Sequence, residues 1–281
     1  MYKIVKKDVL NPYMTRMDID APLVARKAKP GQFIILRVDE FGERIPLTIA
    51  DYDVDKGTVT IIYQKVGATT MLLDTLNEGD SILDFVGPLG KASELEGYKN
   101  AAVIGGGAGC AIAYPQAKAL FNMGAHVDMI AGFRNKDLII LEKEMKEAAH
   151  NLIVMTDDGS NGNKGFVTNA LEAQIEGGAN YDFVIAIGPV PMMKAVSNLT
   201  KKYGIKTVVS MNPIMIDGTG MCGGCRLTVG GQTKFACVDG PDFDGHEVDF
   251  DETMKRLGIY KEQERERANH PCRLLRGEEN A

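Results

Sequence analysis

Three cysteines in the C-terminal third of the chain have the spacing of an iron–sulfur site. Cys222, Cys225 and Cys237 follow Asp217 in the pattern Asp-x4-Cys-x2-Cys-x11-Cys. Plant-type [2Fe–2S] sites use Cys-x4-Cys-x2-Cys with a distant fourth cysteine, so Asp217 stands at the first ligand position. Thiolates are soft, charge-rich donors that suit iron. The pattern therefore predicts a [2Fe–2S] cluster whose ligands are Asp217, Cys222, Cys225 and Cys237.

Two alternatives stay open for this segment. Three thiolates and one carboxylate could form a tetrahedral zinc site. Asp217 could also be a plain loop residue, with water or a backbone amide completing the cluster. Several glycines favour a loop that wraps closely around a cluster, because glycine tolerates unusual φ values. They are Gly218, Gly220, Gly223 and Gly224.

A run of glycines gives the second chemical signal. It joins an expected strand to an expected helix and consists of Gly105, Gly106, Gly107, Ala108 and Gly109. Glycines at such a turn let a pyrophosphate approach the backbone at the positive end of the helix. The run is not a complete Gly-x-Gly-x-x-Gly motif, because Cys110 occupies its last position. A structural turn without a ligand is the alternative.

Other strand ends carry residues that could complete a nucleotide pocket. They are Arg134, Asp157, Asp158, Gly188 and Pro189. Ligands of open α/β sheets bind outside the carboxyl ends of the strands, which would bring these residues to the glycine run. Acidic groups there could bind ribose hydroxyls and favour NAD(H), whereas Arg134 could meet a phosphate. Asp157 and Asp158 could equally be turn or cap residues.

The elements that must position these residues fall into two groups. Before about residue 98, short apolar or alternating segments are separated by turn signals such as Pro30-Gly31, which is typical of a small antiparallel barrel. Beyond it, apolar strands alternate with helices, which indicates a doubly wound parallel sheet. The expected strands are 33–38, 58–63, 81–86, 101–104, 127–131, 152–155, 183–187 and 207–210, and the expected helices are 111–123, 141–150 and 251–268.

These patterns divide the 281 residues into three parts. We predict a β-barrel over 1–97, a NAD-binding α/β domain over 98–211, and a [2Fe–2S] segment with a C-terminal tail over 212–281. Cys110 opens an apolar helix and is expected to be a buried small hydrophobe. Cys272 lies in the polar tail and receives no assignment.

Bulk properties narrow the class of partner and the compartment. The net charge of −6 argues against a nucleic-acid or anionic-membrane surface, since both favour basic patches. No apolar run approaches the roughly 18 residues that span a bilayer, and the N-terminus does not resemble a signal peptide. Clustered cysteines in such a chain indicate metal binding rather than disulfides. We therefore expect a cytoplasmic protein.

Taken together, these features resemble the ferredoxin–NADP reductase-like superfamily. The segments that carry the resemblance are Pro30-Gly31-Gln32-Phe33, Arg44-Ile45-Pro46-Leu47-Thr48, Gly87-Pro88-Leu89-Gly90, the glycine run and residues 188–193. A cysteine segment after the nucleotide domain narrows the resemblance to the branch that holds dihydroorotate dehydrogenase electron-transfer subunits. Asp217 and the stretch Thr156-Asp-Asp-Gly-Ser are most similar to the small (alpha) subunits of NADH-dependent reduced ferredoxin:NADP oxidoreductases.

The resemblance implies that the barrel over 1–97 binds FAD. By this resemblance the FAD-binding residues are Arg44, Pro46, Leu47, Thr48, Tyr63, Gln64, Gly67, Thr69 and Thr70. The family's arginine directly precedes the proline, whereas Ile45 stands there and Arg44 lies one place earlier. Strand alternation would turn Arg44 to the other face unless the strand bulges. Ile187 also replaces a cysteine that many relatives carry before Gly188.

The same resemblance implies an oxidoreductase subunit for electron transport. Nicotinamide exchanges a hydride and a cluster exchanges single electrons, so FAD, which does both, must lie between NAD(H) and the [2Fe–2S] cluster. A larger flavin and [4Fe–4S] subunit would complete a heterodimer and oxidise NADPH. It would send one electron towards ferredoxin and the other through this chain to NAD+, which is electron bifurcation.

Three other functions remain as alternatives. The chain could be the electron-transfer subunit of an NAD-dependent dihydroorotate dehydrogenase, although those subunits usually carry four cysteines where this chain has Asp217. It could be a stand-alone NADH-dependent reductase. It could also be a redox-sensing or binding module without turnover.

Overall fold

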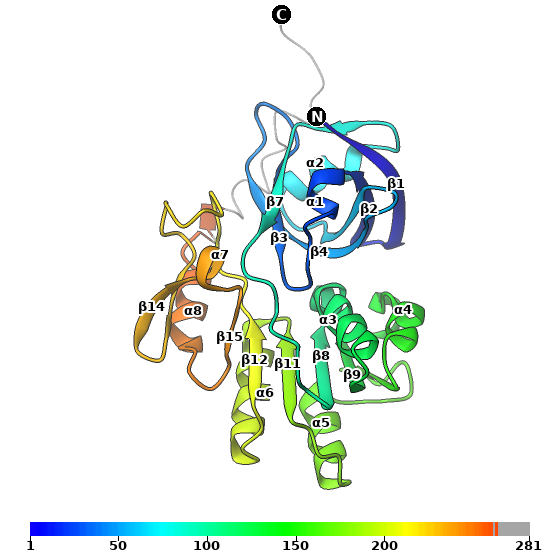
Figure 1. Cartoon of the computed structure of the whole chain (residues 1–281), viewed down its shortest axis with the longest axis vertical. Helices are drawn as coiled ribbons and strands as arrows, with labels where there is room; N and C mark the ends of the chain where they lie inside the picture. The colour runs from blue at the N-terminus through cyan, green and yellow to red at the C-terminus, as the bar shows by residue number, and fades with distance from the viewer. Residues whose placement is uncertain (261, 264–281) are drawn as a thin grey trace, which may run out of the picture.

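The computed structural model describes residues 1–260, 262 and 263. These residues form an antiparallel barrel, a parallel α/β domain and a cysteine-rich segment (Figure 1). In Figure 1 the barrel lies at the top, the α/β domain below it, and the cysteine-rich segment at the left. The fold class predicted from the sequence is confirmed.

The first sheet closes almost completely into a barrel. Its order in the described chain is β6-β1-β2-β5-β4-β3-β7, and all neighbouring strands are antiparallel. Only Leu83 separates the edge strands β6 and β7, which draws the two edges together. Alternate residues such as Met17 and Ile19 of β2 fill its core. The elements are β1 Tyr2–Asn11, β2 Met14–Asp20, α1 Pro22–Ala25, β3 Phe33–Arg37, β4 Ile45–Asp53, β5 Thr58–Gln64, α2 Ala68–Thr75, β6 Ser81–Ile82 and β7 Asp84–Leu89.

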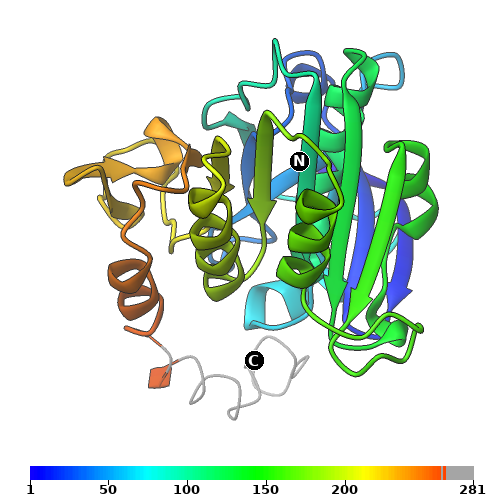
Figure 2. The ribbon, with the colours of Figure 1, turned by 90° about the horizontal axis from the view of Figure 1, so that it is seen from below.

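The second sheet has a parallel centre with the order β10-β9-β8-β11-β12. Its strands are apolar because helices cover both faces: α3 and α4 pack on one face, and α5 and α6 on the other (Figure 2). The elements are β8 Asn100–Gly106, η1 Gly107–Gly109, α3 Cys110–Asn122, β9 His126–Phe133, η2 Lys136–Leu138, α4 Glu142–Glu147, β10 Asn151–Thr156, α5 Val167–Glu176, β11 Phe183–Ile187, α6 Val190–Lys202 and β12 Thr207–Ser210.

The cysteine-rich segment leaves the second sheet and then returns to it. A hairpin of β13 (Arg226–Val229) and β14 (Gln232–Phe235) turns at Gly230 and Gly231, which have φ values of 56° and 73°. Two consecutive positive φ values are typical of the tight turns that join antiparallel strands. After α7 (Ala236–Asp239), strand β15 (Asp242–Asp244) pairs antiparallel with β12 and becomes the edge of the second sheet. The segment and the α/β domain therefore share one sheet.

Shared cores and polar contacts hold the barrel against the rest of the chain. Met14 of β2 packs in the core beneath α3 and α4. Phe33 and Ile35 of β3 pack in the core that includes the cysteine-rich segment. Lys118 of α3 lies 2.9 Å from the Asp51 carboxylate of β4. Because this ion pair is partly exposed, it contributes roughly 1 kcal/mol or less, and the apolar contacts dominate the junction.

Three expected elements differ from those observed. The expected helix 141–150 is shortened to α4, Glu142–Glu147. The expected strand 81–86 is divided at Leu83, where the chain passes from one barrel edge to the other. The expected helix 251–268 begins as α8 (Phe250–Leu257) and stops before Gly258, a residue of low helix propensity. Residues 262 and 263 are again helical. The remainder of that helix and Cys272 lie outside the described residues. No helix in the described chain combines the length and apolarity needed to cross a membrane.

Candidate functional site

The strand-end residues predicted from the sequence lie along one edge of the second sheet. The glycine loop (residues 105–109) ends β8, Arg134 follows β9, Asp157 follows β10 and Gly188 follows β11. The glycine loop also contacts barrel strand β5. A ligand bound at this edge would therefore lie at the border between the barrel and the α/β domain.

Two main-chain segments lie close together where β8 and β11 end, and the side chain of Met192 packs against both. A Cβ at Gly188 would lie 3.1 Å from the Cα of Gly106, and a Cβ at Gly109 would lie 2.3 Å from the carbonyl oxygen of Ile187. Gly107 differs, because its φ is +55° and no atom lies within 4 Å of its Cβ position. Gly106, Gly109 and Gly188 therefore allow close packing. Gly107 instead lines open space where backbone N–H groups can meet a phosphate.

Cys110 lies buried beneath the glycine loop, and a Cβ at Gly105 would lie 2.8 Å from its Sγ. Burial raises the pKa of the Cys110 thiol to about 12, so the thiol stays protonated and unreactive. The prediction that Cys110 is a buried small hydrophobe is confirmed. Ala108 is partly exposed at the start of α3.

The two aspartates predicted in the loop after β10 have different surroundings. Asp158 Oδ1 accepts the Ser160 N–H at 2.9 Å, and hydrogen bonds from Ser160 lower the pKa of Asp158. Asp158 therefore closes its own turn. Its N–H donates to the Arg134 carbonyl at 3.3 Å, which joins this loop to the end of β9. Within the described chain, the Asp157 carboxylate and the Arg134 guanidinium have no hydrogen-bond or ion-pair partner, so both can meet a ligand.

Phe166 is a candidate ligand contact that was not among the site residues predicted from the sequence. It is the N-cap residue of α5, follows the loop after β10 and is 65% exposed. An exposed ring beside a nucleotide site can stack on a base. The signal available in the sequence was its position directly after Gly165, a residue that often marks a turn.

A half-buried strip of β4 forms the candidate flavin surface of the barrel. Pro46, Leu47 and Thr48 lie on this strip and pair in regular register with β3. Partial burial leaves one side of the strip available to a planar ring. Arg44 is exposed just before β4, and the pairing of Ile45–Thr48 with β3 is regular, so it contains no bulge that would move Arg44 to its neighbour's position.

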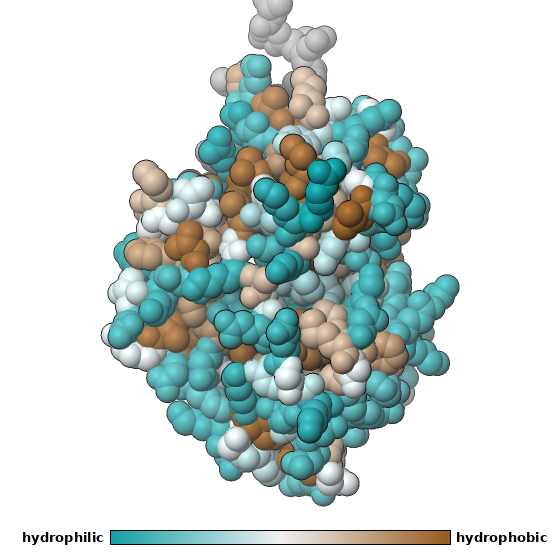
Figure 3. Space-filling model, viewed as in Figure 1, coloured by the Kyte–Doolittle hydropathy of each residue, from teal (hydrophilic) through white to brown (hydrophobic). Residues whose placement is uncertain are grey.

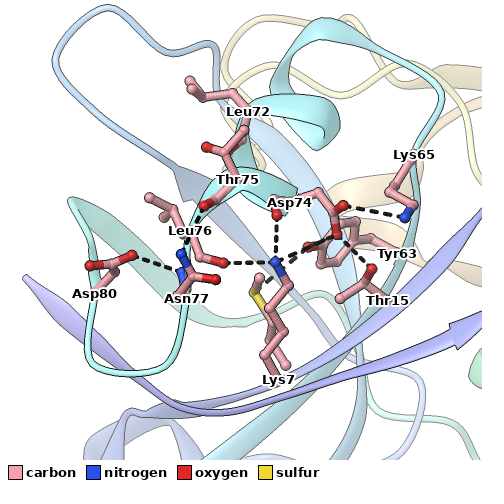
Figure 4. A network of polar contacts seen from close by, with 11 residues as sticks. Lys7, Thr15, Tyr63, Lys65, Leu72, Asp74, Thr75, Leu76, Asn77 and Asp80 are labelled. Atoms are coloured by element: carbon pink, nitrogen blue, oxygen red, sulfur yellow. Dashed lines mark hydrogen bonds and ion pairs between the residues drawn. The ribbon is translucent and has the colours of Figure 1, made fainter. Parts of the chain in front are cut away.

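Tyr63 lies in the barrel core, with 2% of its surface exposed. Its hydroxyl donates to Asp74 Oδ1 at 3.3 Å, and the Thr15 hydroxyl donates to the same oxygen at 2.6 Å (Figure 4). Burial, and then the charge of Asp74, raise the pKa of Tyr63 well above its ordinary value, so the phenol stays protonated. Any contact of residue 63 with a cofactor must therefore come from its main chain, whereas the side chain of Gln64 is exposed.

Asp74 anchors helix α2 to the barrel. Burial raises the pKa of Asp74, but hydrogen bonds from Thr15 and Lys65 and the charge of Lys7 together outweigh burial and lower it. Lys7 Nζ also donates to the main-chain carbonyls of Asp74 and Leu76 at the end of α2 (Figure 4). A cation at this end of a helix is favourable because the last carbonyls carry partial negative charge.

The other end of α2 is open. Gly67 is the N-cap residue, and no atom lies within 4 Å of its Cβ position. The Thr70 hydroxyl accepts the N–H groups of Val66 at 3.2 Å and Gly67 at 3.1 Å, and Thr69 is buried beside them. The first N–H groups of a helix have no partner within it and form an anion site. The residues predicted to lie near the FAD pyrophosphate therefore surround a suitable site.

The predicted cluster ligands gather at the start of the cysteine-rich segment and on α7. The Cys237 N–H points to Cys225 Sγ at 3.4 Å, and the Gly224 N–H points to Cys222 Sγ at 3.4 Å. N–H groups directed at sulfur stabilise thiolate ligands. Asp217 accepts the N–H groups of Thr219 at 2.9 Å and of Cys222 at 2.8 Å, and these bonds lower its pKa. The donor set fits an iron–sulfur cluster, with Asp217 also shaping the loop.

Three thiolates and one carboxylate are chemically compatible with a two-iron cluster and with a single zinc ion. Within the part of the chain that the structure describes, no three His, Cys, Asp or Glu side chains are grouped to hold one metal ion. A structural zinc site needs four ligands around one ion, whereas a [2Fe–2S] cluster divides four ligands between two irons. Burial and then the neighbouring Cys225 raise the pKa of Cys237 to about 12, so iron would have to displace its proton.

Apolar side chains surround the cysteines at the surface. Ile216, Met221 and Val238 are 54%, 86% and 40% exposed. Met221 directly precedes Cys222, and Val238 directly follows Cys237. Figure 3 shows hydrophobic patches on a surface that is otherwise mainly hydrophilic. Exposed apolar groups beside a polar surface are typical of protein contact sites.

Two family models match parts of the chain. The iron-sulfur cluster binding domain of dihydroorotate dehydrogenase B matches residues 212–249. The oxidoreductase NAD-binding domain matches residues 103–198. The first range contains every predicted cluster ligand, and the second contains the glycine loop and the other strand-end residues.

Relatives match nearly the whole chain. It is 48% identical to the dihydroorotate dehydrogenase B (NAD(+)) electron transfer subunit homolog of Thermotoga maritima, over 94% of this chain and 93% of the relative. It is 34% identical to the dihydroorotate dehydrogenase B (NAD(+)) electron transfer subunit of Geobacillus thermodenitrificans, over 87% of this chain and 96% of the relative. An uncharacterized protein of the adh 3′ region of Clostridium beijerinckii is 56% identical, over 94% of this chain and 92% of the relative.

Solved structures agree with this pattern. A chain from the structure of NADH-dependent reduced ferredoxin-NADP oxidoreductase, which addresses flavin-based electron bifurcation, has a TM-score of 0.91 and 46% identity, with 98% of both chains covered. The ferredoxin reductase of carbazole 1,9a-dioxygenase has a TM-score of 0.61 and 20% identity, with 73% of this chain and 64% of that chain covered. The second likeness concerns the fold alone.

The glycine loop predicts different costs for two alanine substitutions. Gly109 has an ordinary φ, but an added Cβ would collide with the Ile187 carbonyl 2.3 Å away. Gly107→Ala meets open space and should cost only the left-handed strain of about 1–2 kcal/mol. We expect Gly109→Ala to lower the free energy of unfolding more than Gly107→Ala does. Chemical denaturation of both variants measures this, and an equal or smaller loss for Gly109→Ala would contradict the packing role.

The Asp74 network predicts an acid-dependent loss of stability. Because its pKa is lowered in the folded chain, the carboxylate contributes stability above the unfolded pKa of about 3.9. That contribution is lost as pH falls through the folded value. The difference in unfolding free energy between wild type and Asp74→Asn should therefore shrink on acidification. Thr15→Val, which removes one donor and keeps the volume, should weaken this dependence partway. A pH-independent difference would contradict the network.

Proposed function

Because the chain belongs to the family of dihydroorotate dehydrogenase B electron-transfer subunits and their homologues, we propose that it is the small, electron-carrying subunit of an NADH-dependent reduced ferredoxin:NADP oxidoreductase. In this proposal it moves electrons between NAD(H), FAD and a [2Fe–2S] cluster. The observation that supports it is that the candidate nucleotide edge, the candidate flavin face of the barrel and the cysteine loop lie at the junction of the domains of one chain.

Bound FAD supplies the chemistry that links hydride exchange with nicotinamide to single-electron exchange with a cluster. The protein's own residues bind and orient. On the barrel, the β4 strip would hold the flavin ring, and the open N-terminus of α2 would hold the pyrophosphate. The proposed FAD contacts are Pro46, Leu47, Thr48, the main chain of Tyr63, Gln64, Gly67, Thr69 and Thr70, with Arg44 at the margin.

The strand-end edge would bind NAD(H). Gly107, Ala108 and the start of α3 would meet the pyrophosphate, because the neighbouring glycines let the backbone come close. The unpartnered Asp157 carboxylate would accept ribose hydroxyls, which favours NAD(H), since a 2′-phosphate would be repelled there. Arg134 would meet a phosphate of the nucleotide. Phe166 would stack on the adenine.

We assign the cluster ligands to Asp217, Cys222, Cys225 and Cys237. Each Asp217 oxygen accepts one backbone N–H and keeps a further lone pair for iron. The backbone conformation of the loop supports this assignment. Its glycines at 218, 220 and 223 have positive φ values that let the backbone wrap around the site.

A larger subunit would dock over the cysteines. The electron-transfer subunits in this family are named as parts of larger enzymes, and the exposed Ile216, Met221 and Val238 surround the ligands proposed here. We propose that this partner carries flavin and [4Fe–4S] clusters, exchanges electrons with NADPH and ferredoxin, and forms a heterodimer in the cytoplasm. Clustered, unpaired thiols support a reducing compartment.

A dihydroorotate dehydrogenase subunit is the second candidate, favoured by the family model that matches residues 212–249. Both candidates use the same electron path within this chain and differ in the partner subunit. Asp217 in place of the usual first cysteine favours the ferredoxin-linked enzyme. Identification of the flavoprotein that copurifies with the native chain decides between them.

Anaerobic titration with NADH tests the proposed path. We expect loss of the oxidised flavin absorbance and a rhombic EPR signal from a reduced [2Fe–2S] centre, with NADPH a poorer reductant. Asp157→Ala should weaken NADH binding about tenfold, or about 1.4 kcal/mol. Asp158→Ala is the matched control, since that carboxylate closes its own turn. A flavin that NADH does not reduce, or a preparation that holds only zinc, would refute the function.

Variants at residue 217 test the carboxylate ligand. We expect Asp217→Cys to keep the cluster with an altered EPR spectrum, because cysteine restores the more common ligand. Asp217→Ala should lose iron and acid-labile sulfide, and Cys237→Ala should lose both completely. Full cluster occupancy in Asp217→Ala would rule out the carboxylate as a ligand.

A further inference from the structure

Three polar side chains, of which Gln116 is buried and Ser93 and Asp242 are half-buried, join all parts of the chain and have no place in the binding sites above. Ser93 lies in the linker between barrel and α/β domain, Gln116 lies on α3, and Asp242 lies on β15. Ser93 Oγ is 2.5 Å from Asp242 Oδ2 and 3.4 Å from Gln116 Nε2. We refer to Ser93, Gln116 and Asp242 as the junction cluster.

Two oxygen atoms of the junction cluster lack a hydrogen-bond donor. Asp242 Oδ1 and Gln116 Oε1 are buried and have no partner among the described residues. An unsatisfied buried polar atom costs about 1–3 kcal/mol, and a charged one costs more. Both atoms are acceptors, so what the junction cluster lacks is a hydrogen-bond donor.

The surroundings of Asp242 do not neutralise a negative charge. The charged residues that line the adjacent cavity of about 260 Å³ are Lys91 and Glu94 of the linker, Lys206 before β12, Asp239 of α7 and Asp244 of β15. In the described chain none of the lysines forms an ion pair with Asp242, and Lys206 Nζ instead donates to the Tyr98 hydroxyl. Helix α3 and strand β12 bring the neutral side chains of Gln116 and Ser210.

We propose that Asp242 is protonated in the folded chain and that the neutral acid, through Ser93 and Gln116, fixes the barrel, the nucleotide-binding sheet and the cysteine-rich segment relative to one another. The added proton removes a buried, unpaired charge and supplies a donor to the cluster. Burial raises the pKa of Asp242, while the hydroxyls of Ser93 and Ser210 act in the opposite direction. Asp242 is a positioning residue in this proposal.

Each member of the junction cluster is connected, by a hydrogen bond or through its own element, to a different candidate binding site. The Ser93 N–H donates at 2.9 Å to the carbonyl of Pro30, which lies three residues before the start of β3 of the barrel. Gln116 lies on the helix that begins at the glycine loop, and β15 follows the short helix that carries Cys237. The inference rests on the proposed function, because hydride transfer requires nicotinamide and flavin to be aligned. A misplacement of about 1 Å can slow such a step about 100-fold.

Two substitutions of Asp242 separate the neutral acid from a carboxylate. Asp242→Asn keeps the shape, is neutral and carries N–H donors, so it should reduce its flavin with NADH at the wild-type rate in anaerobic stopped-flow measurements. Asp242→Ala should be slower by about tenfold or more. Ser93→Ala, a smaller change, should act in the same direction and replaces Asp242→Ala if that variant does not fold. An Asp242→Asn variant as slow as Asp242→Ala would overturn the proposal.

The pH dependence of stability and the infrared spectrum both report on the protonation of Asp242, and neither requires turnover. Because burial raises its pKa, its stabilising contribution is present below the unfolded pKa of about 3.9 and is lost as pH rises through the folded value. Wild type should therefore lose stability relative to Asp242→Asn as pH rises. The infrared difference between them at neutral pH should contain the carbonyl stretch of a protonated acid, and a carboxylate band there would refute the proposal. If NADH fails to reduce wild type, the proposed function fails, yet the infrared result still decides the protonation of Asp242.

Discussion

Direct contact between the main-chain ends of β8 and β11 is the constraint on which the candidate site depends. Gly106 and Gly188 lie so close that a Cβ at Gly188 would be 3.1 Å from its neighbour's Cα, and Gly109 sits against the Ile187 carbonyl. Side chains at these positions would push the glycine loop away from the sheet. With the loop in place, α3 begins at the strand-end edge, and its free N–H groups point to the border with the barrel.

In the barrel, charged side chains hold helix α2 in place, with its N-terminus open to a ligand. Its C-terminal half is fastened by Asp74, Lys7 and Lys65 to the inside of the barrel, while its N-terminus at Gly67 stays open. Several part-buried hydrogen bonds and ion pairs converge on Asp74 and the end of α2, and together they hold the helix in position. The open end can then present N–H groups to a phosphate without reorganising when the ligand binds.

The cysteine-rich segment is part of the second sheet rather than an appendage. Strand β15 pairs with β12, and Phe33 and Ile35 of the barrel pack in the same core as Cys225 and Cys237. The junction cluster adds polar contacts between the same parts. A chain that passes electrons between three bound groups needs its domains to hold constant separations, and shared cores together with a shared sheet provide that rigidity.

The chemistry of the chain and the order of its parts could be predicted from local sequence patterns. Hydrophobic periodicity predicted the barrel and the parallel sheet, and the spacing around Cys222 predicted the ligand set, because both signals are local in the chain. The folded structure was needed to show that the Tyr63 side chain faces the core, that Asp74 of a short helix joins Thr15 across 59 residues, and that Asp242 meets Ser93 across 149 residues. Such contacts arise where distant segments pack together, and a linear pattern of residue types carries no record of which distant partners meet.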